Sequence, residues 1–194
     1  ISCALFACIP LILSGEGGKN SLLRSLEKKY GGTYIVEELA FSWFGFQKAA
    51  GIKIEQANET ITAEEISLDL SLFQFFGMRN YPLEMVFSGE LLVTGGKIYL
   101  PNNTSLSNVD FVTNKEHRSM KMSGNTKTAS GRTGKFLIEG KESDTWDWRG
   151  TTTYFPSQVI ELLYPDFPTA PIIGESFHAK FLYANQDLQL SFDS

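Results

Sequence analysis

The side chains that could do chemistry are few and widely spaced. The two histidines, His117 and His178, have no partner ligand at metal-binding spacing. The two cysteines, Cys3 and Cys8, both stand in the apolar N-terminal run, again without metal-ligand company. The sequence contains no phosphate-binding glycine loop, no zinc-protease motif and no serine-hydrolase elbow. We therefore expect a protein that is not an enzyme and that needs no metal or cofactor.

Three short clusters contain side chains that could take part in catalysis or binding. The carboxylate pairs Glu37–Glu38 and Glu64–Glu65 are adjacent in sequence, but neighbours on a strand point to opposite faces, so neither predicts an acid–base pair. Trp146 and Trp148 share one face of a strand and are typical either of an aromatic binding shelf or, more commonly, of a core or interface. No reaction follows from these residues.

Composition bounds the class of protein. The chain has 194 residues, of which 42% are hydrophobic and 20% charged, which is enough for one folded domain with a core. Its 15 phenylalanines favour half-buried strands. The net charge is -5 and basic residues do not cluster, so we expect no nucleic-acid partner.

The elements that would position these residues are mostly strands. Residues 66–72 alternate apolar and polar, which predicts a strand running over 61–76 with one apolar face. A strand over 33–44 changes phase at Glu37–Glu38, which indicates a bulge. A hairpin is predicted over 83–100 with its turn at 94–96, and another over 177–192. Short alternating runs fill 109–148, and 155–164 has helical spacing after Pro156.

The N-terminal segment is apolar. Residues 1–13 are nearly all apolar and end in a glycine-rich stretch, which is typical either of the end of a transmembrane anchor or of a signal-peptide core. Residues 20–30 predict a short amphipathic helix that ends at Gly31. The expected organisation is an anchor or signal end over 1–14, a helix and linker over 15–32, and one β domain over 33–194 whose strands are expected to continue beyond this sequence.

The order of these segments resembles the N-terminal portion of the AsmA-like and TamB-like bacterial envelope proteins. An apolar segment and a short helix precede a strand ending in the run of 39–47, LAFSWFGFQ, and then GIKI at 51–54. A serine- and leucine-alternating strand and the run of 89–100, GELLVTGGKIYL, follow. The resemblance covers roughly residues 1–100 and is carried by alternation.

The resemblance implies a mainly β fold: a long curved antiparallel sheet, the repeating β-groove, with an apolar concave face, an N-terminal membrane-anchor helix and one or two short helices. It implies an inner-membrane protein with a periplasmic body that carries phospholipid acyl chains between inner and outer membranes, with possible envelope protein partners. The groove residues expected on this basis are Leu39, Phe41, Trp43, Ile66, Leu68, Leu70, Leu72, Phe181, Tyr183, Leu188 and Leu190.

Two readings of the apolar face stay open from the sequence. Alternation fits an open groove and equally the core of a closed sandwich or barrel. In the second case the protein would be an anchored or secreted adhesion or assembly module, with specificity in loops such as 102–108.

Overall fold

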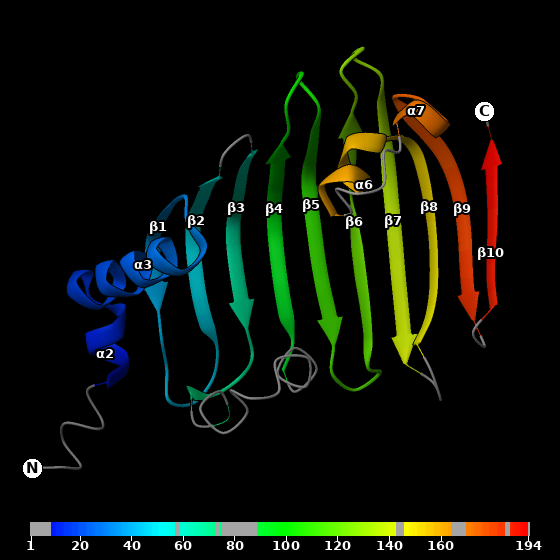
Figure 1. Cartoon of the computed structure of the whole chain (residues 1–194). Helices are drawn as coiled ribbons and strands as arrows, with labels where there is room; N and C mark the ends of the chain where they lie inside the picture. The colour runs from blue at the N-terminus through cyan, green and yellow to red at the C-terminus, as the bar shows by residue number, and fades with distance from the viewer. Residues whose placement is uncertain are drawn as a thin grey trace, which may run out of the picture.

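The chain folds into one open, curved sheet of ten antiparallel strands, in which every strand lies beside its sequence neighbours (Figure 1). The computed structural model describes residues 9–56, 59–72, 74, 89–142, 146–163, 170–184 and 187–193. The mainly β prediction is confirmed. The strands are β1 (Thr33–Ala40), β2 (Gln47–Gln56), β3 (Glu59–Leu68), β4 (Leu91–Tyr99), β5 (Ser105–Asn114), β6 (Ser119–Lys127), β7 (Thr133–Glu142), β8 (Trp146–Pro156), β9 (Ser176–Ala184) and β10 (Asp187–Asp193).

One face of the sheet is apolar along its whole width. It carries the cluster of Leu106, Val109 and Phe136, with Ile98, Met122 and Ile138 packed against it. Helix α6 (Ser157–Leu163) follows β8 directly and adds Val159 to this cluster, so it packs on the apolar face at the middle strands (Figure 1). The helix predicted over 155–164 is confirmed over Ser157–Leu163, but Phe155 and Pro156 end β8 and do not start the helix, and residue 164 lies outside the described residues. A short helix, α7 (Ala170–Ile173), precedes β9.

The alternation changes phase along a single row of residues that crosses the first four strands. Glu37 stands opposite Gly51, and Glu64 opposite both Gly51 and Gly95, as the flanking pairs show. Gly51 and Gly95 both have φ of 61°, which glycine adopts without strain. A β carbon on either would overlap the facing glutamate side chain. The predicted phase change at Glu37–Glu38 is therefore confirmed, but the register of β1 and β2 runs through it without an inserted residue.

Two strand predictions are wrong. The two glycines of 94–96 do not turn a hairpin, because β4 runs through them and pairs with β3 on both sides. Gly95 and Gly96 instead lie where the β4–β5 register shifts, so they form an irregularity inside the strand. The strand predicted over 61–76 ends at Leu68. Residues 73 and 75–88 lie outside the described residues, as does the first part of the hairpin predicted over 83–100.

Two helices cover the edge of β1. Helix α2 (Ile9–Ser14) is joined by Gly15 to helix α3 (Glu16–Tyr30), which begins four residues earlier than the predicted 20–30 and ends at Gly31 as expected. Gly18 permits the close packing of α3 against α2, because a β carbon at this position would collide with the backbone of Ile12 and Leu13. Within the described part of the chain, no helix has the length and apolar character to cross a membrane. Residues 1–8 of the predicted anchor or signal lie outside that part.

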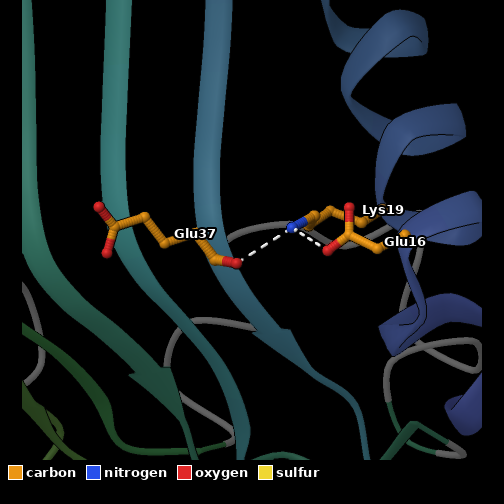
Figure 2. A network of polar contacts seen from close by, with 3 residues as sticks. All are labelled: Glu16, Lys19 and Glu37. Atoms are coloured by element: carbon orange, nitrogen blue, oxygen red, sulfur yellow. Dashed lines mark hydrogen bonds and ion pairs between the residues drawn. The ribbon is translucent and has the colours of Figure 1, made fainter.

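Side chains of these helices satisfy backbone groups on the free edge of β1. The buried Lys19 donates from Nζ to the carbonyl of Glu37 at 3.0 Å and to Glu16 Oε1 at 2.7 Å (Figure 2). The amide of Tyr34 donates to Glu27 Oε1 at 3.4 Å. An uncovered edge strand would offer these groups to another chain, so the helices close this side of the sheet.

Candidate apolar binding face

One uninterrupted apolar row crosses all ten strands. Each member stands directly opposite the next in the strand register, so all share one face of the sheet. The described side chains of this row are half-buried except at the buried Gly150. The transverse row consists of Leu39, Ala49, Ile66, Val93, Phe111, Met122, Ile138, Gly150, Phe181 and Leu190.

A second row lies beside it on the same face. Leu68 stands between Gln47 and Leu91, and at the other side of the sheet Trp148 stands between Gly140 and Tyr183. Met120 and Leu188 continue this row. The two rows together hold seven of the predicted groove residues, which are Leu39, Ile66, Leu68, Phe181, Tyr183, Leu188 and Leu190. The backbone register places Leu188 and Leu190, whose side chains lie outside the description.

Phe41 and Trp43 do not lie on the sheet, which corrects the prediction for both. β1 ends at Ala40, and the amide of Phe41 donates to Ser14 Oγ at 2.8 Å instead of to a neighbouring strand. The loop 41–46 that follows is organised by Gln47. Its Oε1 accepts from the Ser42 amide, and its Nε2 donates to the carbonyls of Ser42 and Gly45.

Leu70 and Leu72 are also misplaced by the strand prediction. They lie beyond β3 and are almost fully buried, with 1% and 3% of their surface exposed. The chain turns here because the Leu70 amide donates to the Leu68 carbonyl, while Gln47 Nε2 donates to the Leu70 carbonyl at 2.9 Å. These two leucines therefore lie beyond the end of β3, in a turn, and they are not members of the two rows.

Aromatic rings fill the space left by glycines on the apolar face. Phe136 lies over Gly124, Trp148 over Gly140 and Phe181 over Gly150, each pair directly opposite in register. Such pairs compensate for the missing side chain of a strand glycine. Trp146 and Trp148 stack with ring centroids 5.5 Å apart, so the two rings lie together as their shared strand face predicts.

The opposite face is polar. Glu139 lies between two cations, with Arg149 Nε donating to its Oε2 at 2.7 Å and Lys121 Nζ 3.6 Å from its Oε1. The Arg149 guanidinium, with a smaller contribution from Lys121, holds the pKa of Glu139 below its usual value. This trio lines a hollow of about 740 Å³ together with the apolar Val112 and Leu182 of the same face and with Met120 and Trp148 of the second row, and none of the predicted groove residues contributes to it.

The residues considered for chemistry remain apart. His117 lies in the β5–β6 turn and His178 in β9, where its ring contacts that of Tyr154. Glu37 and Glu64 cover glycines, and Glu65 pairs with Lys48 at 2.7 Å. In the ranges described, no three His, Cys, Asp or Glu side chains gather in a way that would hold a metal ion.

The sequence did not single out the middle of the transverse row. Val93, Phe111, Met122 and Ile138 lie in segments that alternate, but alternation alone does not say which residues of different strands stand opposite one another. Comparisons with protein-family models, with curated proteins and with solved structures found no match for this chain.

Proposed function

We propose that this chain is a non-enzymatic lipid-binding protein of the bacterial envelope that carries phospholipid acyl chains along its apolar face, between inner and outer membranes. Its body would lie in the periplasm, held at the inner membrane by the N-terminal segment. The resemblance to the AsmA-like and TamB-like proteins supports this assignment, and the transverse row is the structural observation that carries it.

The dimensions of the row suit an acyl chain. Ten strands at a spacing of about 4.8 Å make a row about 43 Å long. One leaflet of a bilayer has an acyl layer of roughly 15 Å, half of the hydrocarbon core. A chain that slides across the strands would therefore meet apolar side chains over its full length at every position.

The chemistry of the row also suits a lipid. Burying apolar surface contributes about 25 cal/mol per Å², so half-buried Phe111, Met122 and Ile138 gain from an apolar partner. The row carries no charged side chain, which fits a ligand recognised by its hydrocarbon part and not by a headgroup. Helix α6 packs on this face at the Leu106–Phe136 cluster, through Val159.

The alternative, a closed β-sandwich adhesion module, receives less support. A sandwich needs a second sheet against the apolar face, and the described strands all belong to one sheet.

Site-specific photocrosslinking tests the proposal. A benzophenone amino acid would replace Phe111 or Phe181, and in matched controls Val112 or Leu182, which are exposed apolar residues one position away on the polar face. Each chain would be expressed in a bacterial host, irradiated in cells, and purified for mass spectrometry. We expect phospholipid adducts at 111 and 181 and not at 112 and 182. Equal adducts at all four positions, or none at 111 and 181, would overturn the proposal.

A further inference from the structure

Exposed apolar side chains gather at the corner of the sheet where the chain enters β1. Phe44 is 81% exposed and Phe46 60%, both in the loop 41–46. Leu11 and Ile12 of α2 are 74% and 59% exposed. Exposed side chains of this size rarely occur close together on a surface that meets only water. We name the two segments, Ile9–Ser14 and 41–46, the apolar corner.

The two segments of the corner are joined. The Phe41 amide donates to Ser14 Oγ at 2.8 Å, which ties the end of α2 to the beginning of the loop. Both lie at the lower left of the sheet in Figure 1, on the side of β1. The two segments of the corner are thus adjacent.

Hydrogen bonds fix the conformation of the loop 41–46, which carries Phe44 and Phe46. Besides the bonds to Gln47, the Ser42 hydroxyl donates to the Phe44 carbonyl at 2.7 Å, and Gly45 has φ of 108°. Gln47 itself is buried and also bonds to Leu70, so the base of the loop is fixed to the body of the protein. The exposure of Phe44 and Phe46 is therefore a property of an organised loop.

The composition of the corner points to a lipid bilayer. Neither segment contains a charged residue, whereas the β5–β6 turn at the same end of the sheet contains Lys115, Glu116 and Arg118. The sequence that leads directly into α2, residues 1–8, is also apolar. A bilayer solvates such side chains at the boundary of headgroups and acyl chains, and it requires no shape complementarity.

We propose that the apolar corner inserts into a phospholipid bilayer through Phe44 and Phe46, so that the loop 41–46 is a membrane contact additional to the N-terminal segment, to which Ile9–Ser14 belongs. The absence of charge means that the insertion needs no anionic lipid. This inference goes beyond lipid carriage along the sheet and does not depend on it, because the corner lies outside the transverse row.

A fluorescent label at the corner tests the inference on the full chain. Cys3 and Cys8 are replaced by serine, and an environment-sensitive dye is attached through Phe44→Cys. The matched control is Ile172→Cys, since Ile172 of α7 is 64% exposed at the other end of the sheet. With vesicles of zwitterionic phosphatidylcholine, we expect the label at position 44 to brighten severalfold, shift to the blue and be quenched by spin-labelled lipid. The label at position 172 should not respond.

A second variant separates the corner from the N-terminal segment. Phe44→Ser combined with Phe46→Ser should weaken vesicle binding at least about tenfold, since burying one Phe side chain contributes a tenfold factor or more. Circular dichroism confirms that the variant is folded. If the chain floats with vesicles while the label at 44 stays in water, or if the double variant binds as well as the parent chain, the inference is wrong. Either result would leave the outcome of the crosslinking test of the transverse row unchanged, so the two proposals can fail independently.

Discussion

The ring of Phe181 in β9 lies across Gly150, the residue directly opposite it in β8. A β carbon on Gly150 would fall within the space of that ring. Both residues belong to the transverse row, so the row stays continuous at the one position where a strand offers no side chain. The same arrangement occurs at Gly124 with Phe136 and at Gly140 with Trp148.

Gly150→Ala should destabilise the protein by about 1–3 kcal/mol, because the ring of Phe181 must move out of a packed position. Urea unfolding followed by circular dichroism measures the loss. The control is Gly17→Ala in α3, where a β carbon would meet no atom and where alanine should add up to about 1 kcal/mol. If Gly150→Ala raised the free energy of unfolding as much as Gly17→Ala does, the packing of the Phe181 ring would not require a glycine at position 150.

Gln47→Ala should cost about 1–3 kcal/mol, because the buried amide supports the carbonyls of Ser42, Gly45 and Leu70 together. The midpoint of urea unfolding reports this loss. Gln56→Ala is the control, since the Gln56 amide makes one hydrogen bond, to the hydroxyl of Tyr34. We expect a smaller effect there, and comparable losses in the two variants would contradict the role of Gln47 as an organiser of the loop.

Lys19→Met should loosen the edge of β1 without unfolding the sheet. The variant removes the donor to the Glu37 carbonyl, and a hydrogen bond from a charged group contributes enough to change local opening on the order of tenfold. Hydrogen exchange of the amides of Thr33–Ala40 should accelerate by that factor, while those of β6 and β7 should not change. Lys28→Met, at an exposed position of the same helix, is the control. Unchanged exchange in β1 would show that Lys19 does not hold the edge.

Glu139 gives a pH dependence with a defined sign. Its pKa lies below the usual carboxyl value because of Arg149, so the folded state favours the ionised form and gains stability above the unfolded pKa of about 4.3. That gain is lost as the pH falls through the lower, folded-state pKa. The parent chain should therefore melt above Glu139→Gln at pH 7, and the two should converge only below the folded-state pKa of Glu139, which lies under the usual carboxyl value. High salt should shrink the difference at pH 7, because the pair is at the surface. A difference that persists at low pH would contradict this.

Local sequence pattern predicted the strands well where apolar and polar residues alternate between turns. Residues 109–112, 119–123, 135–139, 177–184 and 187–192 all lie in strands, and the change of phase at Glu37–Glu38 was visible in the sequence. These features depend only on the two-residue alternation of side chains along a strand, and a short stretch of sequence is enough to show that alternation.

Long-range pairing decided what the pattern could not. Leu70 and Leu72 continue the alternation of β3, yet the Gln47 side chain and the turn at Leu68 take them off the sheet. The pair Gly95–Gly96 is compatible locally with a hairpin turn and with an irregularity inside a strand. Only the pairing of β4 with β3 on both sides of the pair distinguishes the two structures. The middle of the transverse row, with Phe111, Met122 and Ile138, depends on registers that sequence spacing does not specify.

Lys19 and Glu27 of α3 keep strand pairing between copies of this sheet away from the side of β1. Their bonds to the Glu37 carbonyl and the Tyr34 amide occupy backbone groups that the edge of another sheet would otherwise pair with. Edge-to-edge association through β1 would first have to break both contacts, so helix α3 acts as a barrier to aggregation at this edge.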